Sequence, residues 1–114
     1  MATHSTRTLE PGITVVEITG NLQVGKNLSS IEEAIHELIQ GGARKLVVDL
    51  TGLEHIDSSG IGMLTGCRNK MQEAGGQMRL AGAHGVTVRV FAVIHMDEIM
   101  PVDADMAAAC KALG

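Results

Sequence analysis

The chain has 114 residues, the size of a single domain. A formal net charge of −4 without any basic run argues against a nucleic-acid surface, and no apolar stretch approaches the ~20 residues needed to cross a bilayer. The N-terminus lacks the charged-then-apolar pattern of a signal peptide, so we expect a cytoplasmic protein.

The core is expected to be aliphatic. Hydrophobic residues make up 45% of the chain, but Phe91 is the only aromatic one, and seven methionines are available as filler. Cys67 and Cys110 stand alone on two predicted helices. Without a secretory signal, we expect both thiols to be reduced and buried.

The chain begins with the pattern of an edge hairpin. Residues 5–10 and Ile13–Ile18 are expected strands, the second rich in β-branched residues, and Pro11-Gly12 is a turn signal between them. Residues 20–26 are expected to form a loop.

A helix is predicted to follow this loop and to stop at Gly41-Gly42. Glu32 and Glu33 lie three residues after Ser29 and Ser30, as in a capping box. The candidate caps are Asn27, Ser29 and Ser30. The residues with spacings of three and four that form its single apolar face are Leu28, Ile31, Ile35, Leu38 and Ile39.

The middle of the chain predicts a buried strand and a second helix. Lys45–Leu50 is apolar on both faces except at Asp49, which indicates a parallel neighbour or layers on both sides. The helix is expected over Ser58–Ala74, before Gly75-Gly76. Its apolar stripe consists of Ile61, Leu64, Met71 and Ala74, with Cys67 alongside.

The last third continues the alternation of strands and helices. We expect a short strand over Met78–Ala81, a helix from Gly85, an extended piece over Met100–Val102 and a last helix begun by Asp103 or Asp105. The residues expected on the apolar face of the Gly85 helix are Val86, Val90, Phe91 and Ile94. The whole order, β-β-α-β-α-β-α-(β)-α, predicts an α/β domain with parallel strands.

The stretch Ile56–Gly62 lies at the corner between the buried strand and the second helix. Asp57 or Ser58 is placed to cap this helix. Gly60 and Gly62 are expected to let another surface approach the backbone. The corner is either a cap alone or a site where a serine hydroxyl carries a phosphoryl group, which a helix N-terminus favours.

The segments around this corner resemble the STAS family of anti-sigma factor antagonists and sulfate-transporter C-terminal domains. The matching segments are Gly20–Leu22, Leu46–Leu50, Leu53, Ile56–Leu64, Gly75–Leu80 and Val86–Phe91. The resemblance implies one STAS domain over residues 1–114. Its fold would be a small mixed sheet of about four to five strands packed with about four helices.

The resemblance also implies a function. In the anti-sigma factor antagonist branch, the second serine of the Asp-Ser-Ser-Gly motif is phosphorylated by the anti-sigma factor, which is itself a serine kinase. That serine matches Ser59, expected to be exposed at the helix start. Phosphorylation would block binding to this partner and so control release of the sigma factor. The residues expected at the partner surface are Asn21, Gln23, Asp57, Ser58, Ser59, Gly60, Ile61 and Gly62. Gln23 stands where many members carry an acidic residue.

Other functions have weaker support. Ser59, His55 and Asp57 are the residue types of a catalytic triad, but nothing beyond a plain helix start would form its oxyanion hole. The five histidines lack metal-ligand spacing, and no complete nucleotide-binding motif is present, so we expect no cofactor, no metal and no enzymatic activity. The alternative is a STAS accessory subunit of a transport system or stress-signalling assembly. A monomer or weak dimer fits either role.

Overall fold

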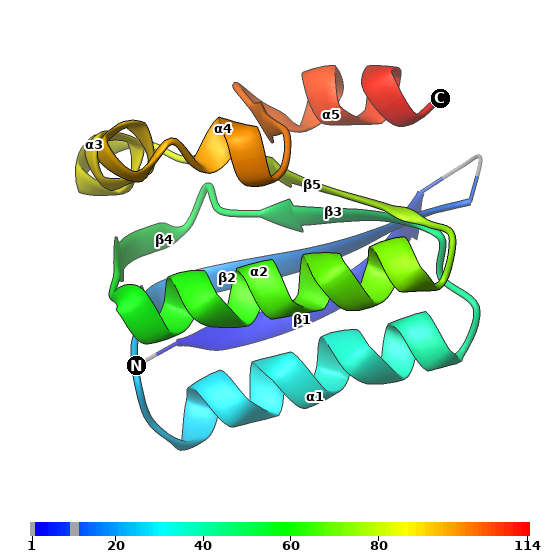
Figure 1. The fold of residues 1–114 in the computed structure, drawn as a ribbon, viewed down its shortest axis with the longest axis horizontal. Helices are drawn as coiled ribbons and strands as arrows, with labels where there is room; N and C mark the ends of the chain where they lie inside the picture. The colour runs from blue at the N-terminus through cyan, green and yellow to red at the C-terminus, as the bar shows by residue number, and fades with distance from the viewer. Residues whose placement is uncertain (1, 10–11) are drawn as a thin grey trace.

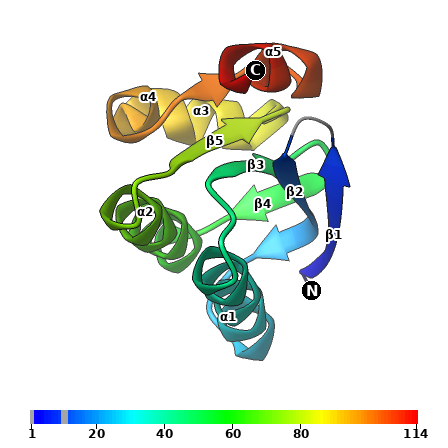
Figure 2. The same cartoon turned by 90° about the vertical axis from the view of Figure 1, so that its right-hand side faces the viewer.

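A computed structural model describes residues 2–9 and 12–114 and shows a mixed sheet covered by helices (Figures 1 and 2). The strands are β1 (Thr3–Leu9), β2 (Ile13–Leu22), β3 (Lys45–Asp49), β4 (Leu53–Ile56), β5 (Gln77–Ala81) and β6 (Val102–Asp103). The helices are α1 (Lys26–Gln40), α2 (Ser58–Glu73), α3 (Gly85–Ile94), α4 (Met96–Ile99) and α5 (Met106–Leu113). The predicted α/β fold is confirmed, with one strand and one helix beyond the expected numbers.

The sheet has the strand order β1-β2-β3-β5-β6. β1 and β2 form the predicted antiparallel hairpin, and the remaining pairs are parallel. Glu10 and Pro11 lie outside the described residues. β4 pairs with the last residues of β2, Gly20 to Leu22, and the register shifts between Gly20 and Asn21. The strand β2 therefore pairs with three strands, β1, β3 and β4.

Each face of the sheet has its own helical layer. On β3, Leu46 and Val48 belong to the large core under α1 and α2, whereas Val47 belongs to a smaller core closed by Ala109 and Leu113 of α5. This alternation is the period of two that a pleated strand imposes. Figure 2 shows α1 and α2 on one side of the sheet and α5 on the other. The prediction that β3 is buried on both sides is confirmed.

The β2–α1 and β3–α2 connections differ from the prediction. The expected loop over residues 20–26 is wrong in part, because β2 runs to Leu22 and α1 begins at Lys26. The sequence analysis did not predict β4, because a strand of four residues beside a turn is too short to show a clear alternation of apolar and polar residues. It places His55 on a strand.

The start of α1 is also different from the prediction. Its N-cap is Gly25, at φ 149°, and no side chain caps the helix. The Ser30 hydroxyl instead donates to the Lys26 carbonyl oxygen, 3.1 Å away, inside the first turn. The three proposed caps are therefore wrong, but the apolar face is confirmed, with Ile31, Ile35 and Ile39 buried.

Two predictions about burial in the last third are wrong. On α3 the buried residues are Thr87 and Phe91, whereas Val86 and Ile94 are exposed. The sequence contained several apolar stripes on this helix, so periodicity alone could not identify the one that packs. Cys110 is half-buried on α5, whereas Cys67 is buried as expected, and both thiols are free.

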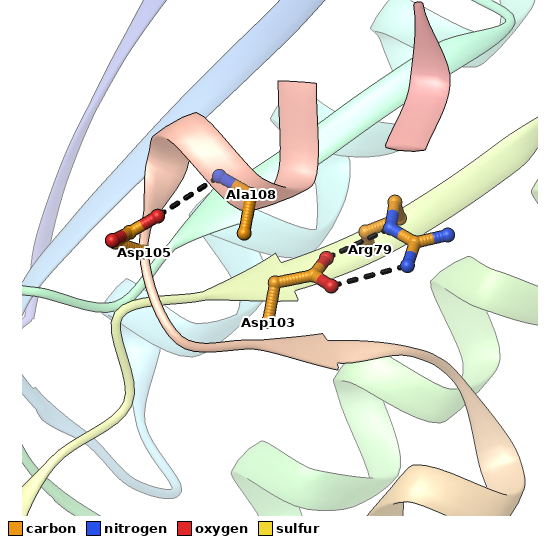
Figure 3. Close-up of polar contacts among 4 residues, drawn as sticks. All are labelled: Arg79, Asp103, Asp105 and Ala108. Carbon is orange, nitrogen blue, oxygen red and sulfur yellow. Dashed lines mark hydrogen bonds and ion pairs between the residues drawn. The ribbon is translucent and has the colours of Figure 1, made fainter. Parts of the chain in front are cut away.

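An ion pair fixes the far edge of the sheet (Figure 3). Arg79 of β5 donates from Nε and Nη2 to the two carboxylate oxygens of Asp103 in β6, at 2.7 and 3.1 Å. This hydrogen bonding to Asp103 raises the pKa of Arg79. Asp105, two residues later, accepts from the Ala108 backbone N–H at 2.9 Å and caps α5. The Arg79 pair thus holds β6 where α5 can begin and cover the sheet.

We predict that Arg79→Met lowers the free energy of unfolding by about 1–3 kcal/mol, because it leaves a half-buried carboxylate without its partner. The control is Arg7→Met. Arg7 pairs with Glu17, but their side chains are 48% and 39% exposed, against 19% and 15% for Arg79 and Asp103. An exposed pair contributes about 0–1 kcal/mol. Urea denaturation measures both, and equal losses would contradict the structural role of Arg79.

Candidate functional site

The corner between β4 and α2 is capped by Asp57. Its backbone is extended, with φ −108° and ψ −179°, and its Oδ1 accepts the Gly60 backbone N–H at 2.9 Å. Of the two predicted candidates, Asp57 is therefore the cap, and Ser58 is the first residue of the helix. The capped turn presents both serines at the positive end of the α2 dipole.

Asp57 also connects the helix to the chain between β2 and α1. Its second oxygen, Oδ2, accepts the Val24 backbone N–H at 3.0 Å, and its own N–H donates to the Leu22 carbonyl oxygen at 3.2 Å. Nearby, His55 Nδ1 lies 3.1 Å from Asn21 Oδ1. These contacts bring the β2–α1 connection beside the start of α2, as the predicted partner surface requires.

The backbone amides around Asp57 lower the pKa of its carboxyl group. The largest cause is the hydrogen bond from Gly60, followed by the one from Val24. Both bonds stabilise the charged form of the carboxylate. The cap is therefore an anion over the neutral pH range, and its charge lies where the helix dipole favours it.

The two serines of the first turn differ in exposure. Ser58 is exposed, whereas Ser59 is half-buried, which differs from the expected open position of Ser59. Ser59 follows Ser58 in the turn and lies next to Gly60, which is buried. Either hydroxyl lies in the first helical turn, where free N–H groups favour an added anion.

The two glycines of the corner have different roles. A Cβ on Gly60 would collide with the Leu22 carbonyl oxygen and would lie 2.8 Å from Ile56 Cγ1. Gly60 is thus needed for packing inside the domain, and the expectation that it faces a partner is wrong. A Cβ on Gly62 would meet nothing within 4 Å, and this residue is exposed.

The other predicted partner residues surround the capped turn. Gln23 is exposed, Asn21 is half-buried, and Ile61 packs partly against the main core. A shallow hollow beside the turn is lined by Ala2, Asn21 and residues 23–27. Val24, which sequence reasoning did not single out, is 77% exposed next to Asp57. The one sequence signal for Val24 was its position close after Gly20–Leu22, a segment that resembles the STAS family.

The structure does not assemble the triad of Ser59, His55 and Asp57. Both carboxylate oxygens of Asp57 accept backbone amides, and the His55 Nδ1 contact is with Asn21. Over residues 2–9 and 12–114, no group of three or more His, Cys, Asp or Glu side chains could hold a metal ion. Within the same residues, no helix has the length and apolar character needed to cross a membrane.

A family model for the STAS domain matches residues 6–109. The chain therefore belongs to the STAS domain family, and the predicted resemblance is confirmed. This match covers β2 to β6 and the whole of the capped corner.

Solved structures support the same fold. The Thermotoga maritima protein tm1081, assigned as an anti-sigma factor antagonist, superposes with a TM-score of 0.88 at 17% identity, over 96% of this chain and 93% of that one. The Bacillus cell fate determinant SpoIIAA in its phosphorylated form superposes with a TM-score of 0.76 at 20% identity, over 98% of this chain and 100% of that one. A sulfate transporter family protein from Wolinella succinogenes superposes with a TM-score of 0.74 at 12% identity, over 94% of this chain and 88% of that one. At these identities the likeness establishes the fold alone.

We predict opposite effects of adding one methyl group to each glycine of the corner. Gly60→Ala should lower the free energy of unfolding by about 1–3 kcal/mol, because the Cβ overpacks against Leu22 and Ile56. Gly62→Ala should raise it by about 0.5–1 kcal/mol, because alanine is the better helix former where space is open. Chemical denaturation of both variants decides this. A neutral Gly60→Ala would contradict the close packing of β2 against α2.

We predict that the stabilising effect of Asp57 depends on pH. The pKa of this carboxyl is lowered in the folded state, so its contribution is complete above the unfolded value of about 3.9. It is then lost as the pH falls through the lowered folded value. Wild type should be more stable than Asp57→Ala at neutral pH, and the difference should shrink in acid. Thermal melts from about pH 7 to 2 measure it; a constant difference would show that the charged cap is not the cause.

Proposed function

We propose that this protein is an anti-sigma factor antagonist in a bacterial partner-switching circuit. In its unphosphorylated form it binds an anti-sigma factor that is also a serine kinase, and the sigma factor is released. Phosphorylation of Ser59 blocks this binding. The observation that carries the proposal is the Asp57-capped first turn of α2, which holds two serines beside the β2–α1 connection.

Membership of the STAS family and the likeness to anti-sigma factor antagonists support this role. One of the similar structures is of a phosphorylated protein, which agrees with a phosphate-regulated site on this fold. The protein acts by binding, in the cytoplasm, and the kinase activity belongs to its partner. Ser59 is the acceptor by its place in the Asp-Ser-Ser-Gly motif.

The switch works through the surface that meets the partner. A phosphate adds roughly −1.5 to −2 charge and three acceptor oxygens. At a helix N-terminus this anion is tolerated by the domain, because the dipole and the free N–H groups favour it. A partner packed closely over the exposed Gly62 and the first turn would instead meet a bulky dianion. Desolvation and repulsion there weaken the complex, and each 1.4 kcal/mol is a tenfold loss of affinity.

The chemistry of the β2–α1 connection narrows the kind of partner. Asn21, Gln23 and the exposed Val24 carry no charge, and Lys26 is the first charged residue after them. A partner that contacts this connection therefore needs hydrogen-bonding and apolar groups opposite Gln23 and Val24. Basic groups there would find no carboxylate on residues 21–25, and the Asp57 carboxylate beside Val24 already accepts the Gly60 and Val24 amides.

We predict that the cognate kinase and ATP label wild type but leave Ser59→Ala unlabelled. Ser58→Ala is the matched control, because Ser58 is the more exposed hydroxyl of the same turn. Phosphosite mapping by mass spectrometry identifies the acceptor. Labelling that persists in Ser59→Ala and vanishes in Ser58→Ala would move the assignment by one residue.

The binding consequence is tested with the same variants. Ser59→Ala should bind the anti-sigma factor constitutively, and Ser59→Asp should bind at least about tenfold more weakly, as expected for repulsion worth about 1.4 kcal/mol. All forms should melt within a few degrees of one another, because the anion suits the helix end. Calorimetric titration together with thermal melts decides it. If Ser59→Asp bound the anti-sigma factor with wild-type affinity, or lost affinity only because the domain unfolds, the proposal that negative charge excludes the partner would be refuted.

A second role is favoured by one observation, the likeness to a sulfate transporter family protein. In that case the domain is an accessory subunit of a transport system, or of a stress-signalling assembly. Co-purification separates the two roles. An anti-sigma factor kinase bound to the unphosphorylated form supports the first, and a stable complex with a transporter supports the second.

A further inference from the structure

Helix α3 presents an apolar stripe that the rest of the described structure leaves exposed except at Val90, which is half-buried. Val86, Val90, Val93 and Ile94 recur at i, i+4, i+7 and i+8, so they lie along one side of the helix. Val86 is 52% exposed and Val93 78%, and Ile94 is exposed as well. The helix packs on β4 and α4, and the residues that it buries, Thr87 and Phe91, lie on the neighbouring side of the helix.

This exposure is unusual because of the composition of the whole helix. Gly85–Ile94 contains one charged residue, Arg89, and apolar residues point in nearly every direction. A helix that is apolar all round is normally buried, and a contiguous exposed apolar patch marks an interaction site. The periodicity that placed Val86, Val90 and Ile94 on one apolar face is thus the pattern expected of a face that a partner can cover.

The charged residue beside the stripe, Arg89, indicates which kind of partner would cover it. Arg89 lies three residues after Val86 and four before Val93, so it flanks the stripe, and it belongs to neither ion pair found among the described residues. In an antiparallel α3–α3 pair with two-fold symmetry, the same flank of each helix comes together. Arg89 would then face a second arginine, which opposes self-association.

We infer that α3 is a docking surface for an amphipathic helix of another protein, with an apolar stripe that covers Val86, Val90 and Val93 and an acidic side chain opposite Arg89. Two helices packed this way would bury the exposed valines and pair the arginine. Figure 1 shows α3 apart from the N-terminus of α2, with β4 between them. The docking therefore goes beyond the Ser59 switch and does not depend on it.

The test uses two synthetic amphipathic helices of about 20 residues, long enough to be helical in water. Both carry the same leucine stripe, but one is flanked by Glu and the other by Lys. Titrated into ¹⁵N-labelled protein, the Glu peptide should shift the amide signals of α3 and bind roughly twofold to fivefold more tightly than the Lys peptide. Arg89→Glu should reverse this preference.

Val93→Asp should remove binding of both peptides while leaving the fold intact, because this side chain is largely in solvent. Val86→Asp is the second variant, should the first fail to fold. The matched control is Val24→Asp, since Val24 is equally exposed but lies on the β2–α1 connection. Unchanged binding in Val93→Asp, or an unchanged peptide preference in Arg89→Glu, would overturn the proposal. So would a wild-type dimer in sedimentation equilibrium that Val93→Asp abolishes.

Discussion

Asp57 joins three parts of this STAS domain. One carboxylate oxygen accepts the Gly60 amide and caps α2, and the other accepts the Val24 amide of the β2–α1 connection. The backbone N–H of Asp57 donates to the Leu22 carbonyl oxygen at the end of β2. Because one residue makes all three bonds, the connection and the first turn of α2 form a single surface. The proposed partner of Ser59 would therefore also contact Gln23 and Val24.

The same arrangement explains why an added phosphate need not disturb the fold. The helix end already holds one anion, with a pKa lowered by the amides of Gly60 and Val24. Ser58 and Ser59 lie in the same turn, where the remaining free N–H groups and the dipole favour negative charge. The core beneath is fixed by close packing at Gly60, so the charge acts outward, on whatever covers the turn.

Periodic segments could be predicted from the sequence, and features set by tertiary contacts could not. The apolar face of α1, the buried β3 and the cap of α2, expected at Asp57 or Ser58 and found at Asp57, depend on local patterns, and all three are confirmed. β4 is too short for a pattern, and the burial of Gly60 depends on Leu22, which is distant in sequence. On α3 the composition allowed several packed faces, and the packing against β4 and α4 determines that Thr87 and Phe91 are inside.

The most direct measurement is the amide spectrum of ¹⁵N-labelled protein before and after phosphorylation by the proposed kinase at the proposed acceptor, Ser59. We expect shifts confined to residues 22–26 and the first turn of α2, with the signals of β3 and β5 unchanged and the melting temperature nearly constant. Shifts that spread through the central strands, or a marked loss of thermal stability, would show that the phosphate rearranges the domain and would contradict the account.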